Sequence, residues 1–359
     1  MNKLLTFITW RSWGLIRYNS VWQNVAALFY VGLARRWFGL DYIRDVLLFL
    51  VFSLTGTAFG YLINDFADVE LDRRAGKPNV FHEISRARAA LVVAAAFGIM
   101  VACGWPFIRR PGFLPLWVAW ALAATLYSLP PVRLKERGAI GLAATIVAQQ
   151  PLPAAMAFAA LGYLREWGAL AFVAYITLRG VSSDVGHQMR DRERDEAAGA
   201  TTFAVRHGHR AIARIYALSL ELETLLLGAV LAVLMVDAPP LRLARWMVAP
   251  AWPLLIAYLI LLPLTVGRAW VRLARGEWVD PYDESPTGPP RDLLHLIHHP
   301  FPTVLFPLYL AVWLTVYYWP NVVFIVGLFF LYGLHDPNRW AGTWPVRMLR
   351  AWIGNKSEV

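Results

Sequence analysis

Hydrophobic residues along this chain form long continuous runs, not the short alternating segments of a soluble fold. Each run has about the length that a helix needs to cross the hydrocarbon core of a bilayer, which takes about 20 residues. The last run fits either one tilted helix with an extension or two short helices around Pro320. We therefore expect an all-α, polytopic membrane protein with nine, possibly ten, transmembrane helices, in the runs 22–39, 43–63, 89–108, 113–129, 139–163, 167–183, 211–236, 245–266 and 300–334.

The polar remainder predicts how the chain is organised. Residues 1–20 carry basic side chains beside Trp10 and Trp13 but lack the compact apolar stretch of a signal peptide, so we expect a retained segment at the membrane interface. Residues 21–335 would form the transmembrane domain. Its longest polar stretch, 267–299, is rich in proline and predicts a loop with a short helix at each end. Residues 336–359 would be a polar, basic tail.

Composition narrows the class of protein further. Hydrophobic residues make up 58% of the chain and charged residues 16%, which excludes soluble, secreted, fibrous and disordered classes. The net charge of +10 could suggest nucleic acid, but the basic residues lie mostly between apolar runs. We therefore expect a lipid bilayer and no nucleic acid as partner. The single cysteine, Cys103, excludes a disulfide framework and a thiolate metal site.

Basic residues also indicate the orientation in the membrane. They are more frequent in the loops after the even-numbered runs, and positive charge accumulates in cytoplasmic loops. We therefore expect an integral protein of the bacterial cytoplasmic membrane whose N-terminus and these four loops face the cytoplasm. The residues are Arg73, Arg74 and Lys77; Arg133, Lys135 and Arg137; Arg190, Arg192, Arg194 and Arg206; Arg268, Arg272 and Arg275.

Acidic residues crowd into two short windows. Of the 24 in the chain, nine lie in these windows: Asp65, Asp68, Glu70, Asp72, Asp184, Asp191, Glu193, Asp195 and Glu196. On a helix, Asn64, Asp68 and Asp72 share one face at steps of four residues. Asp184, Gln188, Asp191 and Asp195 likewise lie close together around the second helix.

Rows of like charge repel unless a cation neutralises them, and oxygen ligands suit Mg²⁺, which often bridges carboxylates to substrate phosphates. A charged helix end can also be no more than a solvated cap. Two matching rows at the cytoplasmic ends of their helices can instead face each other across one cavity. They predict bound Mg²⁺ and a phosphorylated ligand.

Three ordered motifs resemble the UbiA superfamily of intramembrane prenyltransferases. The segment from Asn64 to Asp72 fits the signature N-D-x-x-D-x-x-x-D. Asp191 and Asp195 fit D-x-x-x-D, followed by G-A-T-T-F-A-V-R-H-G at 199–208. Between them, Y-S-L-P-P-V-R-L-K at 127–135 is similar to a segment at the end of the family's fourth span. The resemblance covers residues 20–235 and implies helices around a central cavity that holds Mg²⁺ and an isoprenyl diphosphate.

The resemblance also implies a role for each matching residue. Asn64, Asp68 and Asp72 would hold one Mg²⁺ and Asp191 and Asp195 the other, with Asp65 and Asp184 as supporters or direct ligands. Lys135, Arg133 and Lys77 would bind the diphosphate, and Tyr127 would orient an acceptor. Lys135 and the four aspartates of the two rows, Asp68, Asp72, Asp191 and Asp195, would act in catalysis. The alternative is that these basic residues only reflect the enrichment of Lys and Arg in cytoplasmic loops.

Other features depart from the family pattern or have no assigned role. The stretch from Arg73 to Pro78 is shorter than the family's Arg-x-x-x-Arg-Pro, with Lys77 in place of the second Arg. Gln149 and Gln150 precede Pro151 and Pro153, which predicts a kinked fifth span. Of Glu221 and Glu223, two residues apart, we expect at most one to face the cavity. His295, His298 and His299 lack an evident carboxylate partner, so we expect them to be solvated or interfacial.

Three functions are compatible with these residues. The first is Mg²⁺-dependent transfer of an isoprenyl group from a prenyl diphosphate to a hydrophobic or aromatic acceptor, by ionisation of the diphosphate and attack on the allylic cation. The second is a membrane terpene cyclase that uses the same donor without an acceptor. The third, a cation-coupled transporter, would need acidic residues spread through the depth of the membrane, whereas here they cluster at one rim.

Overall fold

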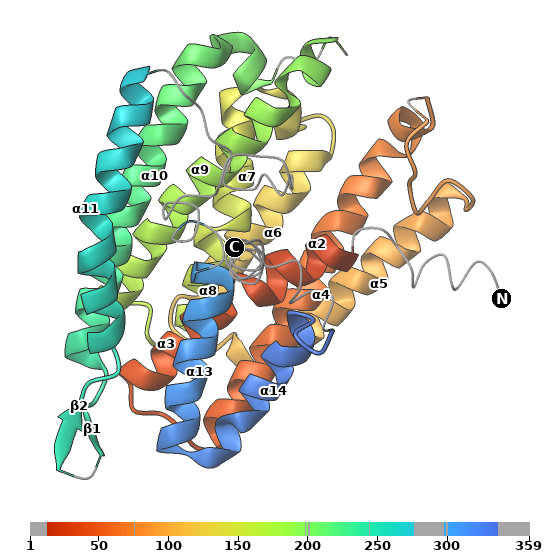
Figure 1. Cartoon of the computed structure of the whole chain (residues 1–359). Coiled ribbons are helices and arrows are strands. Elements are labelled where there is room, and N and C mark those ends of the chain that lie inside the picture. The colour runs from red at the N-terminus through yellow and green to blue at the C-terminus, as the bar shows by residue number, and fades with distance from the viewer. Residues whose placement is uncertain are drawn as a thin grey trace, which may run out of the picture.

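A computed structural model describes residues 13–74, 76–197, 199, 202–243, 245–275, 298 and 301–336. These residues form a bundle of long helices and one short hairpin (Figure 1). The helices are α2 (Trp13–Arg17), α3 (Val25–Ala34), α4 (Leu40–Arg74), α5 (Arg86–Gly104), α6 (Phe113–Ser128), α7 (Ala139–Gln149), α8 (Pro151–Ala160), α9 (Trp167–Ala197), α10 (Phe203–Asp237), α11 (Trp252–Arg275), α13 (Phe306–Tyr317) and α14 (Val322–Leu331). Short turns are η1 (Tyr18–Trp22), η2 (Trp105–Phe107), η3 (Leu134–Glu136), η4 (Phe301–Leu305) and η5 (Trp319–Asn321).

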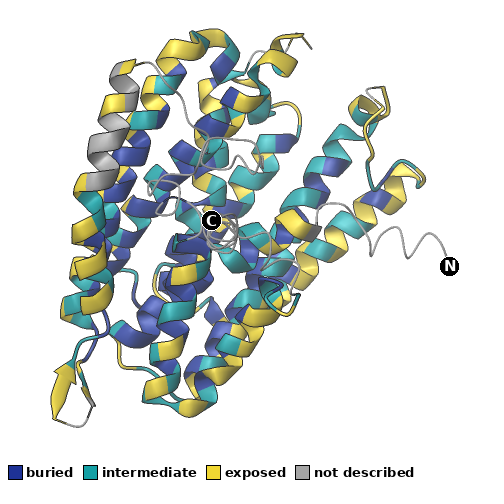
Figure 2. Ribbon diagram, viewed as in Figure 1, coloured by how far each residue is buried: buried dark blue, intermediate teal, exposed yellow. Residues whose placement is uncertain are grey.

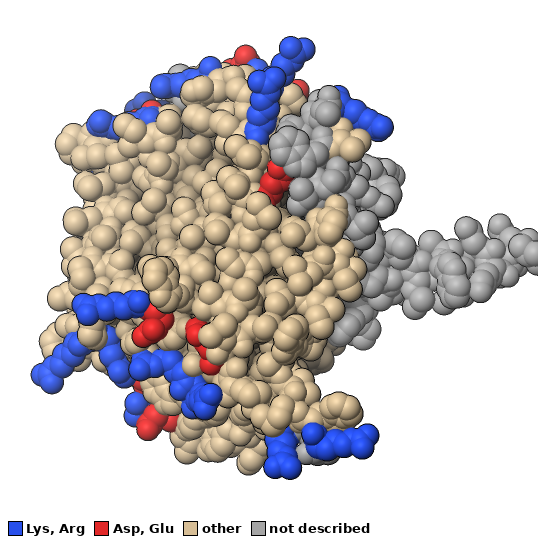
Figure 3. Space-filling model, turned by 90° about the vertical axis from the view of Figure 1, so that its left-hand side faces the viewer, with Lys and Arg blue, Asp and Glu red and all other residues tan. Residues whose placement is uncertain are grey.

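The apolar runs fold into helices that suit a bilayer. Within the described residues, four helical segments are long and apolar enough to cross a membrane, Leu40–Arg74, Arg86–Phe107, Ala139–Ala160 and Phe203–Asp237, and four shorter apolar ones accompany them. Buried residues lie on the helix faces that point into the bundle (Figure 2). A band nearly free of charge separates charged groups toward the two ends (Figure 3). The chain is an integral membrane protein, and its full number of spans stays a prediction.

Prolines break the helices where the sequence predicts. Helix α7 ends at Gln149 and α8 begins at Pro151, because a proline has no N–H to continue the hydrogen-bond ladder. The last apolar run forms two helices, α13 and α14, with Pro320 in the turn between them. There the side chain of Asn321 donates to the carbonyls of Phe38 (3.1 Å) and Leu314 (3.0 Å). The alternative of two short helices around Pro320 is therefore confirmed.

Three boundaries differ from the sequence-based expectation. Strands β1 (Leu241–Leu243) and β2 (Trp246–Val248) form an antiparallel hairpin where we expected the eighth span to begin. Helix α11 continues to Arg275, so its last turns occupy the first part of the predicted loop 267–299. Ile16 and Ser20 are buried whereas Gly14, Leu15 and Arg17 are exposed, so the segment expected at the membrane interface also packs one face against the bundle. The predicted tail lies outside the described residues, apart from Asp336.

A buried polar cluster joins α9, α10 and His298. Glu223 and His298 are each 1% exposed, and Nδ1 of His298 lies 2.8 Å from a carboxylate oxygen of Glu223. Ser182 donates to the same carboxylate (2.5 Å), and Arg179 donates to the backbone carbonyl of His298 (3.2 Å). The expectation of a solvated or interfacial His298 is therefore wrong, because its carboxylate partner lies 75 residues away in the sequence. His295 and His299 lie outside the described residues.

Replacing Glu223 with Ala should destabilise the bundle by about 3 kcal/mol, because two buried donors lose their acceptor at once. The free energy of unfolding, measured in mixed micelles, checks this. Glu221→Ala is the matched control. Oε1 of Glu221 is buried without a hydrogen-bond partner among the described residues, so its loss should leave stability unchanged or raise it. Equal destabilisation by both substitutions would contradict the assignment.

Candidate functional site

Three segments that are distant in the sequence meet at one end of the bundle. The C-terminal part of α4, the segment between α6 and α7, and the C-terminal part of α9 all lie at the end opposite the β1–β2 hairpin, at the top of Figure 1. Both acidic windows and the Y-S-L-P-P-V-R-L-K motif belong to these segments. The helix ends therefore carry the predicted site residues to a common rim.

A cavity of about 610 Å³ lies at this rim. We call it the rim cavity. It brings together residues of both acidic windows and two basic residues: Asn64, Asp65, Asp68, Asp72, Lys77, Arg194 and Asp195. Asn64, Asp68 and Asp72 reach it from one face of α4, as their spacing of four residues predicts. Acidic and basic groups thus line the same hollow, an arrangement suited to an anion bound together with a cation.

Asp68 is the centre of an ionic cluster. Lys135 forms an ion pair with Oδ2 of Asp68 and donates to Oδ1 of Asn64 (3.0 Å). Arg133 donates to Oδ1 of Asp68 (2.9 Å) and pairs with Glu136 (2.5 Å). Ser128 donates to Oδ1 of Asn64 (3.1 Å). The segment after α6 therefore places two cations directly on the first acidic row.

The backbone and the electrostatics of Arg133 both indicate a constrained residue. Its φ of 43° lies in the left-handed region, which costs a residue other than glycine about 1 kcal/mol. Partial burial works to lower its pKa, but the hydrogen bond to Glu136 and the charge of Asp68 outweigh this effect, so the pKa is raised. Arg133 is therefore a permanent cation at the rim.

Asn79 supports the first acidic row, and sequence reasoning missed it. Its side-chain nitrogen donates to Oδ2 of Asp72 (2.9 Å) and to the backbone carbonyl of Asp65 (2.8 Å). Its oxygen accepts from the backbone N–H of Phe81 (2.9 Å). The only sequence signal was its place directly after Lys77-Pro78. Asn79 folds the loop after α4 back onto that helix and orients Asp72.

The second acidic row is more dispersed than its helical spacing suggests. Asp195 lines the rim cavity, whereas Asp191 pairs with Arg194 (2.7 Å) and His187 (3.3 Å) and is not among the residues that line it. Asp184 lies about two turns from Asp191 and three turns from Asp195 on α9, within electrostatic reach of Tyr61 and Tyr127. The structure therefore places Asp195 beside the first row and Asp184 toward the interior. Gln188, on the same helix face, accepts from the backbone N–H of Ala204 (3.2 Å).

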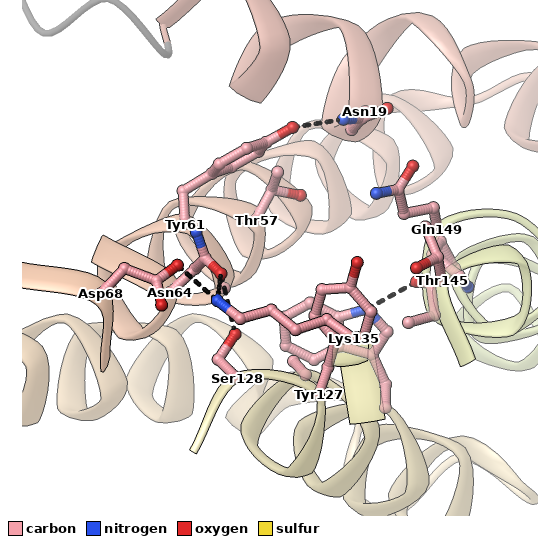
Figure 4. Close-up of a pocket in the computed structure, with 15 residues that line it drawn as sticks. Asn19, Thr57, Tyr61, Asn64, Asp68, Tyr127, Ser128, Lys135, Thr145 and Gln149 are labelled. Carbon is pink, nitrogen blue, oxygen red and sulfur yellow. Dashed lines mark hydrogen bonds and ion pairs between the residues drawn. The ribbon is translucent and has the colours of Figure 1, made fainter. Parts of the chain in front are cut away.

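A second cavity, of about 370 Å³, continues from the rim into the bundle (Figure 4). We call it the deep cavity. It shares Asn64 and Asp68 with the rim cavity, so the two meet at these side chains. Lys135 lies at the same place, and Tyr127 faces the space. The remaining lining is Asn19, Thr57, Gly60, Tyr61, Trp120, Ala124, Ser128, Thr145, Ala148, Gln149 and Pro153.

The donor set of the rim cavity fits Mg²⁺ that is held together with a phosphate. Among the described residues, no three His, Cys, Asp or Glu side chains form a ready-made metal cage. Mg²⁺ does not require one, because it usually binds through one or two carboxylates and fills its other positions with water and substrate phosphates. Asp68, Asp72 and Asp195, with the amide oxygen of Asn64, supply such oxygen ligands around one hollow.

Comparison with known proteins identifies the family. The profile of the UbiA prenyltransferase family matches residues 25–280. The digeranylgeranylglyceryl phosphate synthase of Methanothermobacter thermautotrophicus is 32% identical over 168 residues, 46% of this chain and 57% of that protein. The enzyme of the same name from Thermococcus kodakarensis is 29% identical over 184 residues, 50% of this chain and 63% of that protein. The matched region thus spans about three fifths of these relatives.

Solved structures agree on the fold. A UbiA homolog from Archaeoglobus fulgidus bound to GPP and Mg²⁺ superposes with a TM-score of 0.51 at 19% identity, over 84% of this chain and 98% of that one. A digeranylgeranylglyceryl phosphate synthase structure gives 0.53 at 17% identity, over 91% and 99%. The family profile covers more than two thirds of the sequence. This chain belongs to the UbiA prenyltransferase family.

Proposed function

We propose that this protein is a prenyltransferase that transfers an isoprenyl group from a prenyl diphosphate to a hydrophobic or aromatic acceptor, with Mg²⁺ as cofactor. The observation that carries the proposal is the junction of the two cavities at Asn64 and Asp68. The rim cavity offers carboxylates and cations for an anionic head. The deep cavity offers space for a prenyl chain between helices α4, α6 and α7.

The site residues then have distinct tasks. Asp68, Asp72, Asp191 and Asp195, with Asn64 and supported by Asp65 and Asp184, would hold Mg²⁺, which supplies a Lewis acid for the diphosphate oxygens. Lys135, Arg133 and Lys77 would bind those oxygens and stabilise the charge that develops on the leaving group. Lys135 and Arg133 already lie on Asp68, so each could contact a phosphate that binds beside this carboxylate.

The proposed transfer needs no reactant other than the prenyl diphosphate and the acceptor. The C–O bond between the prenyl C1 and the diphosphate breaks, and its electron pair leaves with the diphosphate. A lone pair or π pair of the acceptor forms the new bond to C1, and the acceptor gives up a proton. The rings of Tyr61 and Tyr127, which line the deep cavity, would stabilise the allylic cation, and the mainly apolar lining would limit the access of water.

We also propose a first acceptor to test and the side of the membrane on which the rim cavity lies. Two relatives are named digeranylgeranylglyceryl phosphate synthases, so a glyceryl phosphate that carries one prenyl ether is the first acceptor to test. The basic residues that gather around the acidic windows favour the cytoplasmic side for the rim.

Product analysis tests the proposal. The full chain in lipid nanodiscs is incubated with Mg²⁺ and a radiolabelled prenyl diphosphate, with and without this acceptor or a hydroxylated aromatic acid. We expect labelled, prenylated acceptor only when an acceptor is present. A cyclic hydrocarbon or alcohol from the donor alone would replace the transferase with a terpene cyclase. Transport of a cation without chemical change of the donor would contradict both.

A further inference from the structure

The deep cavity has a defined far end. Along α4 its lining runs from Asp68 at the rim through Asn64 and Tyr61 to Thr57. Along α6, which runs the opposite way, the lining runs from Ser128 at the rim to Trp120. Thr57 and Trp120 therefore mark the depth of the cavity along α4 and α6, while Asn19, Gln149 and Pro153 line it from the other side.

Trp120 is held rigidly at this end. Its indole Nε1 donates to the backbone carbonyl of Ala148 (2.9 Å), in the last turn of α7, where a helix leaves carbonyls without partners of its own. The rest of the ring lies against Gly56 and Gly60 of α4, where the absence of side chains lets it approach the helix. The ring thus spans from α6 to both neighbouring helices, α4 and α7.

Packed aromatic side chains lie beyond Trp120. One turn deeper on α6, Trp117 meets Phe52 edge to face, with ring centroids 5.4 Å apart, and Phe113 at 6.0 Å. All three are buried in the main core. Space beyond Trp120 along α6 is therefore filled by a close-packed interior, and Trp120 forms the floor of the cavity.

The depth above this floor corresponds to a short prenyl chain. Seven residues of α4 separate Asn64, where the cavities meet, from Thr57, and at 1.5 Å per residue they span about 10 Å. One isoprene unit adds four main-chain bonds of about 1.5 Å, which extend about 5 Å as a zigzag. The space accepts about two units fully extended, and a third where the chain bends.

We propose that Trp120 sets the donor chain length, and that the site prefers prenyl diphosphates of two or three isoprene units over those of four or five. The inference rests on the proposed function, because it assumes that the deep cavity holds the prenyl chain. Trp120 lies outside the three family motifs of this sequence, so these motifs give it no role in specificity. Removing the indole would join the cavity to the space it now occupies.

Binding of non-ionising donors tests the inference. Prenyl S-thiolodiphosphates of two, three, four and five isoprene units, and inorganic diphosphate, are titrated with Mg²⁺ into the full chain in nanodiscs. We expect affinity to be highest at two or three units and at least tenfold lower at five. In Trp120→Ala the optimum should move to four units or more. Trp105→Ala, which removes an indole that is 70% exposed on the surface, should keep the wild-type profile.

The possible results separate the two claims. If affinity in the wild-type chain rises through four and five units, Trp120 is not a floor, although binding as such supports the proposed function. If no prenyl compound binds better than inorganic diphosphate, the deep cavity does not hold the chain and both claims fail. If the Trp120→Ala variant binds inorganic diphosphate like the wild type, its rim cavity is intact. An unchanged preference for chain length in such a variant overturns the inference.

Discussion

Asp68→Ala is expected to lower the rate of Mg²⁺-dependent prenyl transfer about 1000-fold, on the scale that removal of one preorganised electrostatic group reaches in other enzymes. Asp68 lines both cavities and forms ion pairs with Lys135 and Arg133, so its loss removes a proposed Mg²⁺ ligand and one anionic partner of each cation. Release of diphosphate from a labelled prenyl donor, with acceptor present, measures the effect.

The control for this substitution lies on the same helix. Glu70 is exposed and pairs with Arg73 at the surface, so Glu70→Ala removes one acidic charge from the same window without touching either cavity. We expect it to retain nearly full activity. An Asp68→Ala variant that keeps more than a tenth of the wild-type rate would show that the cluster does not carry the reaction.

Lys135→Ala is expected to lower the transfer rate about 100-fold, because the substitution removes the cation that we propose stabilises the leaving diphosphate. The same change frees Asp68 and Asn64 from the ammonium group, so Mg²⁺ alone should bind more tightly than in the wild type. Lys135→Arg keeps the charge but not its compact shape and should restore the activity only in part.

Two measurements, the rate of transfer and the affinity for Mg²⁺ in the absence of donor, check this prediction. Arg110→Ala provides the control, because Arg110 pairs with Asp45 near the opposite end of the bundle and contributes the same charge. It should change neither quantity. If Lys135→Ala binds Mg²⁺ more tightly but transfers the prenyl group at the wild-type rate, Lys135 only pairs with Asp68 and has no role in catalysis.

Local patterns predicted much of the molecule. Long apolar runs follow directly from the length of a bilayer-spanning helix, and the break at Pro151 follows from a missing N–H. Helical spacing placed Asn64, Asp68 and Asp72 on one face, and all three line the rim cavity. Each of these predictions depends only on residues within a few turns of one another.

Contacts between distant segments were beyond such reasoning. Lys135 reaches Asp68 across 67 residues, and His298 reaches Glu223 across 75. Spacing alone cannot show that Asp191 turns toward Arg194 and His187 while Asp195 faces the rim, because this depends on how α9 is rotated in the bundle. The ends of the deep cavity likewise depend on which aromatic side chains pack beneath it.

Binding of a prenyl diphosphate with and without Mg²⁺ is the most direct test of the central claim, that two acidic rows and their cations hold this donor at one rim. The full chain in nanodiscs is titrated with a three-unit prenyl S-thiolodiphosphate at constant ionic strength, with Mg²⁺ or with excess chelator. We predict binding at least 100-fold tighter with Mg²⁺, and loss of this difference in Asp68→Ala. Equal affinity with Mg²⁺ and with chelator in the wild-type chain would contradict the claim.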